Sequence, residues 1–257
     1  MPSIRRLIAG VGALAAAAGL VALLNGPWLR VHGVSWVGAQ YTDARELASL
    51  LDGQEGASIL AVDTRAIGAR IRQLPAVAEA TVTASLTGQV EATLVEREVA
   101  IVWETRSARL LGSMEGMIFA LIRGDAALTG DLAAAPRVTD ERRSARLLTV
   151  GDAIPPALLD ATMRILAIDP VTLGSRAERL TVRIDDEYGF RLASTEPEWE
   201  IAFGVYGTDP RVTSAEAAAR LERQVTAVRT LFAEEAEDEI GWVDVRNPGK
   251  VYFRAKG

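Results

Sequence analysis

The sequence of 257 residues contains no cysteine, one histidine and two lysines. Without cysteine, neither a disulfide framework nor a thiolate metal site can form. The histidine, His32, follows a long apolar run and lies beside Gly33, without catalytic partners nearby in the sequence, so we expect it in an exposed linker. The lysines, Lys250 and Lys256, both lie near the C-terminus. Bases that titrate near neutral pH are therefore scarce, which argues against a hydrolase.

The stretch from Leu7 to Leu24 lacks any charged or strongly polar side chain. A helix of that length covers about 27 Å, close to the hydrocarbon core of a bilayer. Arg5 and Arg6 directly precede it, and such basic flanks stay in the cytoplasm. We predict a cytoplasmic tail at residues 1–6, a transmembrane helix through the lipid bilayer at residues 7–24, and an extracytoplasmic remainder.

Two other interpretations of this run stay open. A cleaved signal peptide also begins with basic residues, but its apolar part is about 7–15 residues long and ends in a small-x-small site. The run here is longer, and Asn25-Gly26-Pro27-Trp28 follows it without such a site. A buried core helix would normally carry a polar face. The length of the apolar run and the residues on either side of it favour a retained anchor. Trp28 would then be an aromatic residue at the membrane interface.

The charge balance is acidic, with a net charge of −6. When Arg5 and Arg6 are set aside, 26 of the 28 basic residues remain against 34 acidic ones, so the exported part carries −8. That balance argues against nucleic acid and anionic lipid head groups as main partners. Hydrophobic residues make up 49 % of the chain, which is typical of a folded protein.

Residues 30–98 are predicted to form a small α+β domain of order β-α-α-β-β. A short strand ends at Gly38, and Asp43 and Asp63 are expected to cap two helices with apolar residues at helical spacing. Two alternating strands follow, joined by a turn at Thr87-Gly88-Gln89. The helices would cover one face of a three-stranded sheet.

Residues 99–257 are predicted to form a mixed β domain with two helices. One helix is expected after Pro155-Pro156, and the other after Thr213, which opens a T-x-x-E capping box. The stretch from Arg123 to Arg146 has little periodicity, so we predict a loop with a short extended segment at residues 136–138.

An acidic run, Glu234 to Glu239, follows the second of these helices. Negative charge at a helix C-terminus is unfavourable, so the run is expected to extend beyond the helix into solvent. A divalent-cation site is the alternative, although the acidic residues lack a regular ligand spacing.

The chain ends in a predicted hairpin with a turn at Asn247-Pro248-Gly249. An edge strand can accept a strand of another protein, and aromatic and arginine side chains suit such interfaces. Trp242 and Tyr252 could instead cover the domain's own core, because alternation alone does not separate these alternatives. The candidate partner-binding residues are Trp242, Val243, Asp244, Val245, Arg246, Val251, Tyr252, Phe253 and Arg254.

The chain shows no residue constellation suited to catalysis, a metal or a cofactor. Asp185 and Asp186 are adjacent carboxylates, but neighbouring side chains on a strand point to opposite faces. We therefore interpret the protein as a non-enzyme without cofactors.

The order of these motifs resembles a known family. Val34-Ser35-Trp36-Val37-Gly38, Leu74-Pro75-Ala76-Val77 and Val95-Glu96-Arg97 resemble a POTRA domain, and behind a lone anchor they are similar to the cell-division family FtsQ/DivIB. Val243-Asp244-Val245-Arg246 is similar to the I-D-L-R segment of that family's β domain. The family often has arginine and proline where this chain has Leu86-Thr87-Gly88.

This resemblance implies a single-pass scaffold of the bacterial division machinery, at the septum in the plasma (inner) membrane. It implies FtsB/DivIC-like and FtsL-like bitopic partners, bound through the end of the β domain, and a POTRA domain that helps recruitment to the division site. A POTRA-type accessory or chaperone module of protein transport is the competing hypothesis. Such proteins usually carry several POTRA repeats or an outer-membrane barrel, and the sequence shows no second copy of the pattern.

Overall fold

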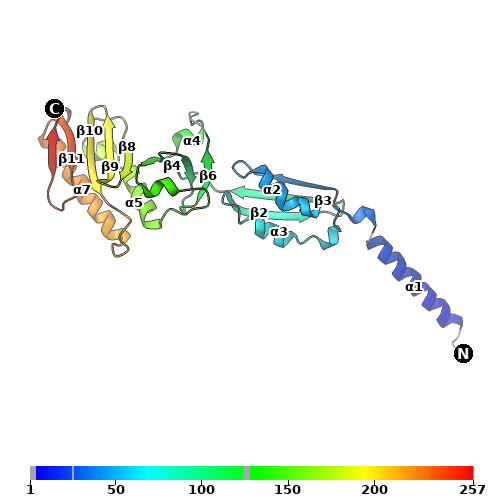
Figure 1. The fold of residues 1–257 in the computed structure, drawn as a ribbon. Coiled ribbons are helices and arrows are strands. Elements are labelled where there is room, and N and C mark those ends of the chain that lie inside the picture. Colours follow the sequence, from blue (N-terminus) through cyan, green and yellow to red (C-terminus); the bar gives the residue numbers. More distant parts are fainter. Residues whose placement is uncertain (1–3, 25, 124–127, 257) are drawn as a thin grey trace. The chain divides into compact units, whose positions relative to one another are not determined.

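The computed structural model describes residues 4–24, 26–123 and 128–256 (Figure 1). The chain divides into two compact units, Met1–Arg97 and Glu98–Gly257, and each contains a hydrophobic core. The predicted anchor falls within helix α1 (Ile4–Leu24). Among the residues described, no helix has the combined length and apolar character that crossing a membrane requires.

The first unit contains a sheet of strand order β1-β3-β2, in which β1 runs parallel and β2 antiparallel to β3. Two helices supply Leu47, Leu51, Ile67 and Ile71 to the core against this sheet. The predicted order β-α-α-β-β is confirmed. The elements after α1 are η1 (Pro27–Leu29), β1 (Gly33–Val37), α2 (Ala44–Leu51), η2 (Asp52–Gln54), η3 (Ile59–Ala61), α3 (Thr64–Ile71), β2 (Val77–Ala84) and β3 (Gln89–Glu96).

Hydrogen bonds fix the first turns of α2 and α3 and the loop that precedes α2. The carboxylates of Asp43 and Asp63 accept backbone N–H groups at the starts of α2 and α3, as predicted. Glu96, at the end of β3, accepts the backbone N–H groups of Tyr41 and Thr42 at 2.8 and 2.7 Å. Arg97 then donates from Nε to the carbonyl of Pro75 at 3.0 Å. The Val95-Glu96-Arg97 motif therefore ties the last strand to two loops of the unit.

The second unit contains a mixed sheet of strand order β12-β11-β10-β9-β8-β7-β4-β5-β6. The pairs β4–β7, β7–β8 and β10–β11 are parallel. Its elements are β4 (Ile101–Thr105), β5 (Arg109–Gly112), β6 (Ile118–Ile122), α4 (Asp131–Ala134), β7 (Arg137–Asp140), η4 (Ser144–Leu147), α5 (Pro156–Leu166), α6 (Pro170–Leu173), β8 (Thr181–Asp185), β9 (Gly189–Thr195), β10 (Glu198–Gly204), α7 (Ser214–Glu234), η5 (Glu237–Glu239), β11 (Ile240–Asp244) and β12 (Tyr252–Ala255).

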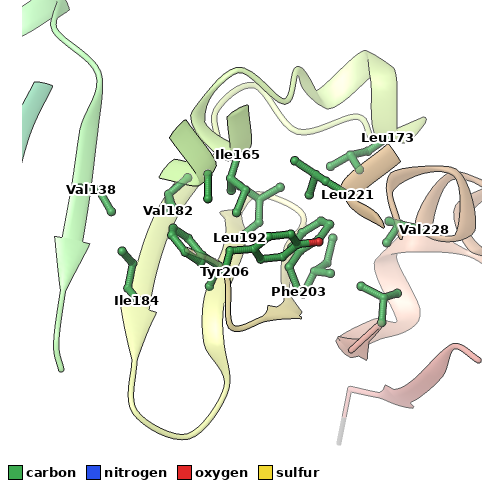
Figure 2. Packing of buried hydrophobic residues seen from close by; sticks show 14 of the residues in the cluster. Val138, Ile165, Leu173, Val182, Ile184, Leu192, Phe203, Tyr206, Leu221 and Val228 are labelled. Atoms are coloured by element: carbon green, nitrogen blue, oxygen red, sulfur yellow. The ribbon is translucent and has the colours of Figure 1, made fainter. Parts of the chain in front are cut away.

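Parallel pairs need crossover connections, and helices supply them for two of the three pairs named above. Helices α5 and α6 connect β7 to β8, and α7 connects β10 to β11. The capping box of Thr213 and Glu216 begins α7, as predicted. The core lies between these helices and the sheet. Figure 2 shows its side chains, including Val138, Val182, Ile184, Leu192, Phe203, Ile165, Leu173, Leu221 and Val228.

The stretch from Arg123 to Arg146 is more regular than its sequence predicts. The extended segment is confirmed as β7, but this strand lies in the sheet interior, paired with β4 on one side and β8 on the other. Its four residues are too few for a visible period, and Val138 and Asp140 are its buried positions. Short helices α4 and η4 flank it, and residues 124–127 lie outside the described part.

The acidic run extends beyond α7 with Glu235, Asp238 and Glu239 exposed, as expected, but the expectation of solvent exposure is wrong at Glu237. Helix α7 ends at Glu234, but Glu237 is 5 % exposed. Its carboxylate accepts hydrogen bonds from the hydroxyl of Ser175, the backbone N–H of Arg176 and the indole N–H of Trp199. Polar donors on segments distant in the sequence satisfy this buried charge, which a linear charge count does not reveal.

Candidate partner-binding surface at the C-terminal edge

Strand β12 is the edge strand at one end of the second unit's sheet, and among the described residues it pairs with β11 alone. The predicted hairpin is confirmed, with Asp244 opposite Tyr252 and Gly249 in the left-handed region at φ +72°. The N–H of Lys256 donates to the carbonyl of Glu239 at 2.8 Å. Because successive backbone groups of a strand alternate in direction, residues 253 and 255 direct their N–H and carbonyl groups to the open edge.

The side chains of β11 and β12 also alternate. Val243 is fully buried in the core, and Phe253 lies opposite it. Trp242 pairs with Arg254 on the other face of the hairpin. This face, away from α7 and the core, is called the open face below.

Aromatic and charged side chains form a continuous row on the open face. The guanidinium of Arg254 lies 5.8 Å from the ring centre of Trp242, which meets the ring of Tyr188 edge-on at 4.8 Å between centroids. Arg246 covers the Tyr188 ring at 4.8 Å and pairs with Asp244, with 2.7 Å between Nη2 and Oδ2. We call these five residues the open-face row. It presents π faces and guanidinium groups, which are frequent at protein interfaces.

The charges in this row have a defined ionisation state. Hydrogen bonds from the Arg246 side chain lower the pKa of the Asp244 carboxyl, and the same pairing raises the pKa of Arg246. The neighbouring Glu187 carboxylate raises the pKa of the Tyr188 phenol. At neutral pH the row therefore carries an ion pair, a neutral phenol and the further positive charge of Arg254.

The open face continues beyond this row into a network around Arg191. Its guanidinium pairs with Glu200 at 2.8 Å and Glu141 at 3.1 Å, and also with Asp185. Arg183 approaches Glu141 at 3.6 Å. Both arginines of this network are therefore paired with carboxylates of the same domain.

A basic groove lies between α7 and the β11–β12 turn, with a volume of about 220 Å³. Arg220, Arg223, Arg246 and Lys250 contribute to its lining. Arg220 covers the ring of the buried Tyr206 at 4.7 Å, so part of the groove's charge is fixed by packing. The groove adds positive potential beside the C-terminal edge.

The structure separates the predicted partner-binding residues into two groups. Val243 and Val245 are 0 % and 2 % exposed, and Val251 packs against the same core, so these side chains support the domain. Tyr252 and Phe253 are 50 % and 44 % exposed. Arg254 is also exposed, while Trp242, Asp244 and Arg246 are half-buried.

Sequence reasoning did not identify Tyr188 as part of this surface. It lies in the turn between β8 and β9, more than fifty residues before Trp242. The parallel pairing of β10 with β11 brings the two together, and the sequence pattern did not specify that pairing.

The prediction that the side chains of Asp185 and Asp186 diverge is confirmed. Asp185 accepts the backbone N–H groups of Glu187 and Tyr188, whereas Asp186 pairs with Arg143 at 3.2 Å. Within residues 4–24, 26–123 and 128–256, no group of three or more histidine, cysteine or acidic side chains is placed to hold a metal ion.

Comparisons with known proteins identify the family. Residues 29–97 match the family model of the FtsQ-type POTRA domain. The chain is 31 % identical over 184 residues to the cell division protein FtsQ of Streptomyces venezuelae, covering 67 % of this chain and 68 % of that protein. These findings confirm the resemblance drawn from the motifs. The chain belongs to the FtsQ family of cell-division proteins.

Proposed function

We propose that the protein is a non-enzymatic, membrane-anchored scaffold that links early and late proteins of the divisome. In this proposal FtsB/DivIC-like and FtsL-like proteins bind by adding a strand to β12. Membership of the FtsQ family supports the general role in division. The observation that carries the binding mode is the edge of β12 at the end of the sheet, which has no strand partner within the described part of the chain.

The side chains around this edge support the same mode. Strand addition draws affinity from backbone hydrogen bonds, and neighbouring side chains provide specificity. Tyr252 and Arg254 lie on the edge strand itself, and Trp242 lies beside them on β11. An incoming strand would run next to the open-face row, where aromatic and arginine side chains can contact it.

We propose that residues 7–24 are the membrane anchor and that residues 1–6 lie in the cytoplasm. A POTRA domain at residues 30–98 and a β domain at residues 99–257 would then lie on the extracytoplasmic side of the membrane. The uncharged run and its preceding arginines support this topology. The proposed location is the plasma (inner) membrane at the division septum. Alkaline extraction of membranes tests the anchor, because an integral protein stays in the pellet whereas a cleaved or peripheral protein is released.

Two variants at one position test strand addition. Phe253→Pro removes an N–H directed to the open edge, and edge strands tolerate proline there. Phe253→Ala removes the same side chain but keeps the N–H. Each variant is prepared as the full chain in nanodiscs. Its affinity is then measured for the purified extracytoplasmic segments of the FtsB-like and FtsL-like proteins.

We expect Phe253→Pro to bind at least about tenfold more weakly than Phe253→Ala, because a lost backbone bond leaves a partner carbonyl unsatisfied. Circular dichroism spectra matching those of the unsubstituted chain show that both variants are folded. Equal affinity of the two variants would remove strand addition at β12 from the proposal.

A fluorescent fusion separates division from transport, since midcell rings support the scaffold and uniform envelope signal supports the transport module.

A further inference from the structure

We propose that the end of the first unit at which β1 begins rests on the bilayer, with Trp28, Leu60 and Leu86 in the interfacial layer of the lipid. This inference rests on the proposed membrane anchor. It assigns a lipid surface as the partner of three apolar side chains that the fold leaves exposed.

Three segments distant in the sequence meet at this end. The N–H of Val31 donates to the carbonyl of Ala57 at 2.9 Å, and the N–H of Gly56 donates back to Val31 at 3.0 Å. The N–H of His32 donates to the carbonyl of Gly88 at 2.8 Å. The segments before Leu60 and after Leu86 are therefore held on either side of the chain that follows Trp28.

The three side chains are strongly exposed although they are large and apolar. Trp28 is 56 %, Leu60 58 % and Leu86 72 % exposed. Leu86 lies at the tip of the β2–β3 turn, which the N–H of Gly88 closes by donating to Ser85 at 2.9 Å. Single exposed apolar residues are ordinary, but three gathered at one end of a domain indicate a contact surface.

The length of the connecting chain points to lipid as the occupant. Leu29 already packs against the core of the first unit, and Val31 is 3 % exposed within that core. Only four residues, 25–28, lie between Leu29 and Leu24, the end of α1, and the five chain steps from Leu24 to Leu29 span at most about 17 Å when fully extended. So short a connection holds this end of the domain beside the membrane that α1 would enter.

Charge at this end is nearly balanced. The exposed Arg30 donates from Nη1 to the carbonyl of Gly56 at 2.9 Å, and Glu55 precedes that glycine. A tryptophan and two leucines beside one basic and one acidic residue favour the interfacial layer of a zwitterionic bilayer. We therefore expect the contact to form without anionic lipid.

The absence of cysteine makes a direct test simple. Leu60→Cys and Leu86→Cys variants of the full chain are labelled with the environment-sensitive dye NBD and placed in phosphatidylcholine nanodiscs containing doxyl-labelled lipid. Leu147→Cys, at a position 80 % exposed in the second unit, is the matched control. Ala15→Cys, within α1, reports on the anchor itself.

We expect doxyl lipid to quench NBD at positions 60 and 86 at least about twofold more than at position 147, with blue-shifted emission. Quenching at positions 60 and 86 equal to that at 147, with strong quenching at 15, would overturn the inference and leave the anchor in place. Weak quenching at position 15 would instead overturn the anchor. If doxyl lipid does not quench NBD at positions 60 and 86, the exposed leucines there favour a protein partner for this end of the first unit.

Discussion

The indole Nε1 of Trp199 donates a 2.7 Å hydrogen bond to Oε1 of Glu237, which joins β10 to the segment that connects α7 to β11. The same carboxylate accepts the hydroxyl of Ser175 and, at 3.0 Å, the backbone N–H of Arg176, both of which precede β8. One buried charge therefore ties three segments together next to the parallel β10–β11 pair. That pair carries the hairpin whose outer strand is the proposed partner site.

Replacing the Glu237 carboxylate is expected to lower the free energy of unfolding. Glu237→Ala leaves the indole N–H, the Ser175 hydroxyl and a backbone N–H without their acceptor, so the free energy of unfolding should fall by about 3 kcal/mol. Urea denaturation followed by tryptophan fluorescence measures this change. Glu239→Ala, two residues further on at an exposed position, is the control and should change stability by less than about 0.5 kcal/mol. Similar midpoints for the two variants would contradict a structural role for Glu237.

The same contact predicts a dependence on pH. Burial raises the pKa of Glu237, but the hydrogen bonds from Ser175, Arg176 and Trp199 outweigh it, so the pKa lies below its ordinary value of 4.5. The stabilisation is present above the unfolded-state pKa and is lost as pH falls through the lower folded-state pKa. Unfolding free energies measured between about pH 6 and pH 3 should fall more steeply for the unsubstituted chain than for Glu237→Gln. Parallel curves would show that the carboxylate ionises alike in both states.

The sequence predicts well what depends on local signals. Asp43, Asp63 and Thr213 are capping residues that act within three positions, and each caps its helix as expected. The C-terminal hairpin follows from turn residues between two alternating strands. These features need no knowledge of the rest of the fold.

Features that depend on distant pairing are not predicted. Strand β7 has four residues, and its place between β4 and β8 follows from crossover connections rather than from its own pattern. Glu237 appears in the sequence as one more acid in a solvated run, because its donors lie about 40 and 60 residues away. The place of Tyr188 in the open-face row is not predicted either, because its partner Trp242 is also distant in the sequence.

Glu96 explains why a charged residue ends the last strand of the first unit. Its carboxylate accepts the N–H groups of Gln40, Tyr41 and Thr42 at 2.7–2.8 Å, which fixes the loop before α2. Glu96→Ala should lower the stability of this unit by about 2–3 kcal/mol, because charge-assisted bonds are lost and donors are left without an acceptor. Amide hydrogen exchange at residues 40–42 should accelerate. Glu91→Ala, at an exposed position of the same strand, is the control, and equal exchange rates in both variants would refute this role.

Tyr188 offers a test of the open-face row that is independent of β12. Its ring contacts Trp242 edge-on and lies beneath the guanidinium of Arg246, so it orients two side chains that the proposed partner would meet. Tyr188→Ala should weaken binding of the FtsB-like segment by about tenfold, because central aromatic and arginine residues dominate interface energetics. Tyr188→Phe keeps the ring and should bind within about twofold of the unsubstituted chain. Isothermal titration calorimetry distinguishes the two variants, and unchanged affinity of Tyr188→Ala would exclude the open-face row from the interface.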